Sequence, residues 1–262
     1  MRLQIWARLE AEPRLFVQLS MRSKFSFLIV FFVLAASSAF GQSVVITKKK
    51  TVYRRPKPMI DFKRTFTVTR PVVKASTPAL SKKITAAVSP ESVLELNIKE
   101  ELGEMQWLEE SDFETVYNKN GILCIRQWMT GTAAYPDSVT KYVVVDTKTG
   151  TKPTIQELFS DLDGLAAKLK KLQTAQVKKA ILEIKKDPEN ADADPEQLFE
   201  STDLTANELD QFSISSDGVT FYYDYGFPHV LEALQPDGEF KLTWAELKPF
   251  IRPDGLLARF IR

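Results

Sequence analysis

The sequence contains one cysteine and one histidine among 262 residues, and these two scarcities exclude several kinds of site. A single cysteine, Cys124, allows neither an internal disulfide nor a cysteine-based zinc cluster. A Ser-His-Asp or Cys-His arrangement would need the lone His229 as its base, and the chain has no G-x-S-x-G nucleophile motif. One histidine with scattered acids is also a poor zinc set. We therefore predict no catalytic, metal-binding or cofactor-binding residue.

The sequence also lacks the usual patterns of phosphate-binding and calcium-binding loops. No glycine-rich loop that could cradle a phosphate occurs among the ten glycines. The acidic run DPENADADPE at 187–196 invites a calcium interpretation, but an EF-hand loop needs glycine at its sixth position and glutamate at its twelfth. Counted from Asp187, those positions hold Asp192 and Leu198, so the pattern fails. Binding of a hard cation by an irregular loop stays an open alternative.

An export signal occupies the start of the chain. The stretch MRSKFSFLIVFFVLAASSAFGQS, beginning at Met21, has positive residues, an apolar stretch at 25–36 and small residues up to Gly41. It predicts a signal peptide over 1–41, with Met21 as the true start, Gln42 as the mature N-terminus and a periplasmic or secreted product. The apolar stretch is shorter than the roughly 20 residues of a spanning helix, so we expect no transmembrane segment in the mature chain. A retained membrane anchor is the alternative.

Charge divides the rest of the chain into two unequal parts. Residues 42–88 hold twelve Lys or Arg and one acid, a net charge of +11, whereas residues 89–262 hold eighteen basic and thirty-one acidic residues, a net charge of −13. Prolines interrupt β-type stretches such as TFTVT at 65–69, which predicts an extended, mostly disordered basic arm over 42–88. Such an arm either binds an anionic envelope polymer, or serves as a linker or contacts its own acidic domain. Export argues against nucleic acid as a partner.

Strand signals dominate the start of the acidic part. SVLELNIKE at 92–100 alternates apolar and polar residues, as a half-buried strand does. DFETVYNKNGILCIRQWMTG predicts a hairpin around Asn120-Gly121, with Cys124 as a small buried apolar residue. Another strand is expected in SVTKYVVVDTKTG, and further strands surround the Asp217-Gly218 turn.

Helix signals complete the fold class. Thr154 with Glu157, and Thr243 with Glu246, are capping boxes at the starts of short helices. Apolar residues at helical spacing over 165–186 predict one main amphipathic helix with a solvated, lysine-rich outer face. These elements predict an α+β domain over 89–262 with mixed or antiparallel sheets, divisible into subdomains 89–160 and 161–262.

Several stretches together resemble a known family: NKNGILCIRQWMTG, YVVVDTKTGTKPTIQELF, FSISSDGVTFYYDYG and FKLTWAELKPFI. They are similar to the paired exported domains of unknown function in RsiV-type lysozyme-sensing anti-sigma factors, which also precede some peptidoglycan deacetylases. The resemblance covers roughly 93–251 and implies an α+β envelope module without a cofactor or catalytic residues of its own. The segment GFPHVLEALQPDGE at 226–239 departs from the family, whose members have a stretch rich in Gly, Ala and Tyr there.

Candidate ligand contacts gather in YYDYGFPHV at 222–230. Aromatic side chains there can form a sugar-stacking face, so the candidates are Tyr222, Tyr225, Phe227 and His229. Strand alternation places Tyr225 on the core side and makes Tyr222 the better exposed contact. For His229 we expect a structural or partner-contacting role.

Two functions remain open from the sequence. The first is a non-catalytic envelope module that binds a cationic extracytoplasmic protein such as lysozyme, or a wall polymer. The second is an envelope hydrolase that acts on carbohydrate or peptidoglycan through a carboxylate pair, which no spacing in the sequence singles out.

Overall fold

The computed structural model of the protein describes residues 44–60, 63–190, 194–200 and 202–261. The part of the chain from Gln42 to Arg262 forms one compact unit. The predicted signal peptide at 1–41 lies outside the described residues. Within the described ranges, no helix combines the length and the apolar character that a membrane span requires.

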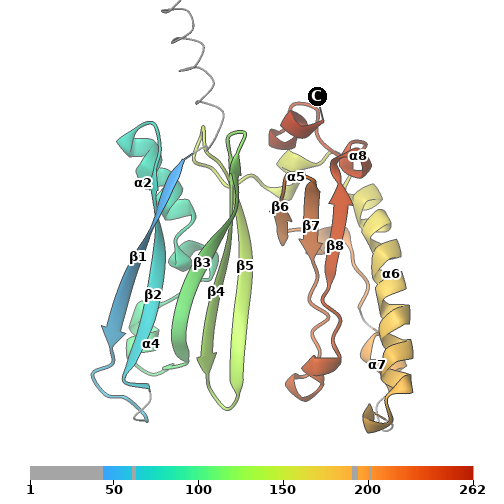
Figure 1. Ribbon diagram of the computed structural model, residues 1–262, viewed down its shortest axis with the longest axis horizontal. Coiled ribbons are helices and arrows are strands. Elements are labelled where there is room, and N and C mark those ends of the chain that lie inside the picture. Colours follow the sequence, from blue (N-terminus) through green and yellow to red (C-terminus); the bar gives the residue numbers. More distant parts are fainter. Residues whose placement is uncertain (1–43, 61–62, 191–193, 201, 262) are drawn as a thin grey trace, which may run out of the picture. The chain divides into compact units, whose positions relative to one another are not determined.

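A five-stranded sheet forms the first half of this unit (Figure 1). Its strand order follows the sequence, and all neighbours are antiparallel except β2 and β3, which run parallel over a short stretch. The strands are β1 Val45–Arg54, β2 Thr65–Lys74, β3 Leu108–Lys119, β4 Ile122–Thr132 and β5 Pro136–Asp146.

The prediction of a disordered basic arm over 42–88 is wrong. Residues of this segment form β1, β2 and the helix α2 (Pro78–Ala87), and all ten residues of β1 pair with β2. The prolines do not interrupt these strands, because Pro71 lies within β2 and Pro78 begins α2 at a position where proline is tolerated. Eight of the twelve basic residues of this segment thus lie in β1, β2 and α2.

The second half contains a small sheet and the main helix. Strands β6 (Phe212–Ile214), β7 (Gly218–Tyr222) and β8 (Glu239–Thr243) form an antiparallel sheet in that order. Helix α6 (Leu162–Lys186) packs along this sheet, on the side away from the large sheet (Figure 1). The other α-helices are short: α3 Pro90–Val93, α4 Ile98–Leu102, α5 Ile155–Leu158, α7 Pro195–Leu198 and α8 Trp244–Leu247. Short 3₁₀ helices occur at Pro188–Asn190, Ala206–Glu208, His229–Leu234 and Leu256–Phe260.

Strand β4 is buried on both faces and joins two cores. Leu123 and Ile125 pack toward α2, in one cluster with Ile84. Ile122 and Cys124 pack on the opposite face, in a cluster that includes residues of the small sheet and of α6. Because neighbouring side chains of a strand point to opposite faces, one short apolar run serves both cores.

Local signals of the sequence are confirmed at most turns and caps. Asn120 and Gly121 both have positive φ, 54° and 73°, as the predicted two-residue hairpin turn requires. The capping boxes at Thr154 and Thr243 are both present, and the α+β class with one main helix is confirmed.

The strand predicted at 92–100 is wrong. This stretch contains the end of α3, a connection and the start of α4. The side chain of Ser89 caps α3, and that of Asn97 accepts hydrogen bonds from the Lys99 and Glu100 amides at the start of α4. These local side-chain bonds favour helix starts over the strand that the apolar alternation suggested.

Candidate binding groove

The structure distributes the four candidate contact residues over three environments. Tyr222 is half-buried at the end of β7, and its ring stacks on Tyr142 of β5 with centroids 4.0 Å apart and planes 5° apart. Its hydroxyl lies 2.9 Å from Ser213 Oγ. Burial, and then the neighbouring Tyr222, raise the pKa of Tyr142 well above its usual value. One face of the Tyr222 ring is therefore covered by a partner from the large sheet.

Tyr225 and Phe227 belong to an aromatic cluster beneath α6. Tyr225 is 6% exposed, and its ring lies perpendicular to that of Phe199 at a centroid distance of 5.5 Å. Phe227 packs on Phe199 at 5.0 Å. The Tyr225 hydroxyl donates a hydrogen bond of 2.8 Å to Gln176 Oε1, and burial raises the pKa of this hydroxyl. These two rings support α6 from within the molecule.

His229 lies on the surface, in the 3₁₀ turn that follows Phe227. Its Nδ1 is 3.1 Å from Glu232 Oε2, and its ring centroid is 4.9 Å from that of Tyr135, at the tip of the β4–β5 hairpin. Cys124 is fully buried, and burial raises the pKa of its thiol to about 12. Among the described residues, no three His, Cys, Asp or Glu side chains lie close enough together to hold a metal ion.

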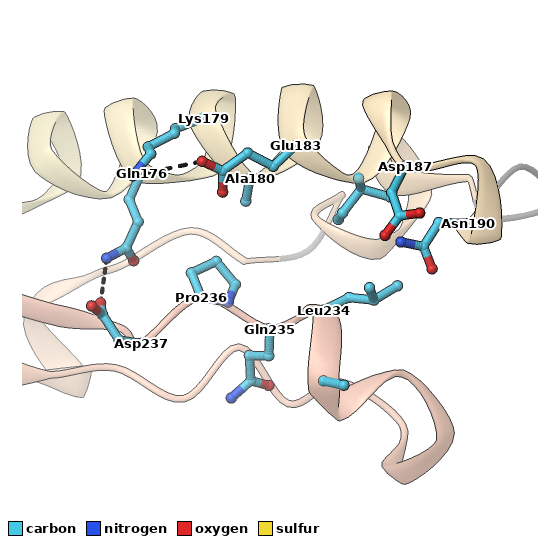
Figure 2. A pocket seen from close by; sticks show the side chains of 12 residues that line it. Gln176, Lys179, Ala180, Glu183, Asp187, Asn190, Leu234, Gln235, Pro236 and Asp237 are labelled. Carbon is cyan, nitrogen blue, oxygen red and sulfur yellow. Dashed lines mark hydrogen bonds and ion pairs between the residues drawn. The ribbon is translucent and has the colours of Figure 1, made fainter.

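A groove runs between α6 and the segment 233–237, beside the aromatic cluster (Figure 2). Its volume is about 380 Å³, and its apolar lining includes Ile184 and Leu234, which also belong to the cluster around Tyr225. One wall of the groove comes from α6 and the residues that follow it, and the other comes from the segment 233–237. The helix wall has Gln176, Lys179, Ala180, Glu183 and Ile184, the segment after it has Asp187 and Asn190, and the facing wall has Ala233, Leu234, Gln235, Pro236 and Asp237.

Polar contacts hold the two walls together at one end of the groove. Gln176 Nε2 donates to Asp237 Oδ1 at 2.5 Å, while Gln176 Oε1 accepts from Tyr225, so one amide connects the groove to the cluster (Figure 2). Lys179 lies 3.7 Å from Glu183 on the same helix face. With Asp187, the lining holds three carboxylates and one lysine. The groove lining therefore combines an excess of carboxylates with apolar side chains such as Ile184 and Leu234.

None of the residues that line the groove was predicted as a contact. The wall at 233–237 lies inside the segment 226–239, where the sequence differs from the resembled family. Of the four candidates, Tyr225 and Phe227 support the groove, whereas Tyr222 and His229 lie elsewhere. The lysine-rich face of α6 and the acidic run from Asp187 were both visible in the sequence, but nothing there pairs them with 233–237.

Comparison with known proteins identifies the fold. The sequence matches no protein-family profile and no curated protein. Two crystal structures share the fold: a member of the DUF3298 family, a domain family of unknown function, from Bacteroides fragilis, and a DUF3298 family protein from Pseudomonas aeruginosa. The first has a TM-score of 0.52 and 13% identity over 84% of this chain and 98% of that chain. The second has a TM-score of 0.52 and 15% identity over 82% of this chain and 96% of that chain.

Proposed function

We propose that this protein is a non-catalytic binding module of the cell envelope that holds a cationic segment of an extracytoplasmic protein in the groove between α6 and 233–237. The observation that carries the proposal is the lining of that groove, which has a volume of about 380 Å³ and combines three carboxylates and one lysine with apolar side chains. A basic side chain with an aliphatic stem matches this combination, since its stem packs on apolar surface while its charge lies beside carboxylates.

The charge of the surrounding domain supports a cationic partner. Residues 89–262 carry a net charge of −13, which attracts a basic protein over long range and raises its association rate. None of the basic residues of 42–88 lines the groove, and eight of the twelve belong to β1, β2 and α2. We expect the charge of the domain to speed the diffusional encounter with a basic protein, and the groove to form the specific contact with it.

The class of partner comes from the motif resemblance to RsiV-type lysozyme-sensing proteins. Lysozymes are basic proteins, so a lysozyme-like protein satisfies both the charge and the expected location. Export rests on the signal-like sequence that begins at Met21. Mass spectrometry of the exported product tests this part of the proposal, with a mature N-terminus at Gln42 as the expected result and a membrane-retained chain containing 25–36 as the contrary one.

Calorimetric titration with a basic lysozyme tests the binding role. We expect saturable heat with a defined ratio that persists near physiological salt, where charges farther apart than about 8 Å are screened. Glu183→Lys should weaken binding at least 10-fold, because it reverses a charge on the groove wall. The matched control is Glu104→Lys, which makes the same change of net charge at an exposed site outside the groove lining.

Three results would contradict the proposal in different ways. Heat that disappears smoothly with salt means non-specific attraction. Equal weakening by Glu183→Lys and Glu104→Lys means that the domain charge acts without the groove. Retention on isolated wall polymer, unaffected by lysozyme, would replace the protein partner by a polymer.

A further inference from the structure

Strand β1 forms an open edge of the large sheet. It is hydrogen-bonded to β2 along its full length, and no other strand in the described ranges pairs with its outer side (Figure 1). The opposite edge strand, β5, is partly covered, because the amide of Tyr142 donates to Gln211 Oε1 and β6 packs beside it. In the described ranges, β1 therefore offers a row of backbone N–H and C=O groups along its whole outer side.

Positive side chains flank this open edge on both faces. Lys48, Lys49 and Lys50 follow one another in the middle of β1, so they alternate between the two faces of the sheet. Lys48 is paired with Asp112, at 2.8 Å. Within the described part of the chain, no acidic side chain pairs with Lys49, Lys50 or Arg54, and all three are exposed.

The exposed apolar residues of β1 extend the same surface. Val45 is 52% exposed and Val52 is 62% exposed, near the two ends of the strand. Lysine on an edge strand is one of the features that discourage pairing, but β1 also has ten residues in unbroken register without proline, so its backbone keeps the geometry that an added strand needs. Length, an open backbone and unpaired cations together favour an extended, acidic ligand.

We propose that the outer edge of β1 binds an extended acidic segment of a partner protein as an added sixth strand. Main-chain hydrogen bonds along β1 would supply affinity, as in other cases of strand addition. Carboxylates at successive positions of the added strand would lie opposite Lys49 on one face and Lys50 on the other. A second copy of this chain does not fit in register, because β1 against β1 would bring lysines together.

Fluorescence anisotropy with a labelled peptide in which Glu-Glu and Val-Val pairs alternate, so that carboxylates lie on both faces of the added strand, tests the proposal on the chain from Gln42 to Arg262. We expect saturable binding at about 0.15 M salt, where distant charges are screened. A peptide of the same sequence with alternate backbone amides methylated keeps its charge but loses hydrogen bonds, and it should bind at least 10-fold more weakly.

Charge variants of the protein provide the second arm. Lys49→Glu with Lys50→Glu should abolish binding, whereas the matched control Lys171→Glu with Lys178→Glu, at exposed positions of α6, should change it less than 3-fold. All four lysines are exposed, so thermal unfolding should show that both double variants fold. Glu183→Lys should leave peptide binding unchanged, which separates this surface from the proposed groove.

Two outcomes would overturn the proposal. Equal binding of the methylated peptide, with displacement by polyphosphate or by anionic lipid vesicles, would make β1 a surface for polyanions rather than a site of strand addition. Absence of saturable binding at about 0.15 M salt would leave the lysines as protection of the sheet edge against pairing.

Discussion

Two pairs of strands in the same sheet, β3 with β4 and β1 with β2, differ in how clearly the sequence predicts them. Strands β3 and β4 have burial on one or both faces, and their apolar pattern and Asn120-Gly121 turn predict a hairpin. Strand β1 reads VITKKKTVYR and has no buried residue, although it pairs with β2 over its full length. A central strand can be predicted from its buried apolar residues, whereas an edge strand such as β1 is held mainly by its hydrogen bonds to the neighbouring strand.

The comparison teaches that the basic segment is a structural part of the domain. Val44, Val73 and Ile84 pack in one core cluster with Leu123 and Ile125 of β4. Arg55, directly after β1, is 2% exposed and donates a hydrogen bond to the carbonyl of Leu108, the first residue of β3. Most of the charge of residues 42–88 is therefore exposed, while Arg55, Lys63 and the apolar residues of this region in the core cluster are buried.

Removing the first two strands should have the largest effect. A chain that begins at Ser89 loses β1, β2 and α2, and so exposes the face of β4 that packs on them. We expect no cooperative thermal transition for 89–262 and a clear one for 42–262, by circular dichroism and calorimetry. A cooperative transition of the shorter chain would instead show that residues 89–262 fold alone, as expected for a separate domain. The division of this domain into subdomains 89–160 and 161–262 stays a prediction.

The same comparison shows which parts of the molecule were predictable. Caps and tight turns depend on residues within four positions of one another, so Thr154, Thr243 and Asn120-Gly121 were recognised from the sequence. The groove depends on contacts such as Gln176 to Asp237, which are 61 residues apart. No local rule brings such residues together, so the sequence predicted α6 as an amphipathic helix with a solvated outer face and gave no sign of the groove.

Aromatic residues of the candidate site illustrate the same limit. Alternation correctly placed Tyr225 toward the interior, where it is 6% exposed. It could not place Tyr142 against Tyr222, because that stack joins two different sheets. The face of a strand to which a side chain points follows from the local sequence, whereas the residue that packs against this side chain depends on the whole fold.

Two adjacent arginines allow the largest single-residue test of the basic segment. Arg55 donates to Leu108 O at 2.7 Å and to Glu101 Oε2 at 3.2 Å, and Glu101 is itself buried. Arg55→Ala leaves this carboxylate without its cation, which costs about 3–5 kcal/mol of unfolding free energy in buried pairs. Arg54→Ala, at an exposed site, should stay within about 0.5 kcal/mol. Urea denaturation measures both, and similar values would mean that Arg55 is not a structural clamp.

A smaller effect is expected where the aromatic cluster meets the groove. Tyr225→Phe removes the hydroxyl that donates to Gln176 Oε1 and leaves that oxygen without its partner. We expect a loss of about 1 kcal/mol in urea denaturation. Tyr135→Phe is the matched control, because Tyr135 is 61% exposed, and it should be nearly neutral. If Tyr225→Phe is equally neutral, the hydroxyl does not brace the groove wall.

The smallest effect should come from replacing His229, the only histidine of the sequence, whose scarcity was the first argument against an enzyme. Its side chain is 46% exposed, its pairing with Glu232 is a surface contact, and Cys124 is fully buried and therefore no accessible nucleophile for it to activate. His229→Ala should change the unfolding free energy by less than about 0.5 kcal/mol and partner affinity by no more than a few-fold. A general base contributes about 10²–10⁴ to a rate, so a loss of that size in any reproducible activity of the protein would make His229 catalytic and would replace the binding module by a hydrolase.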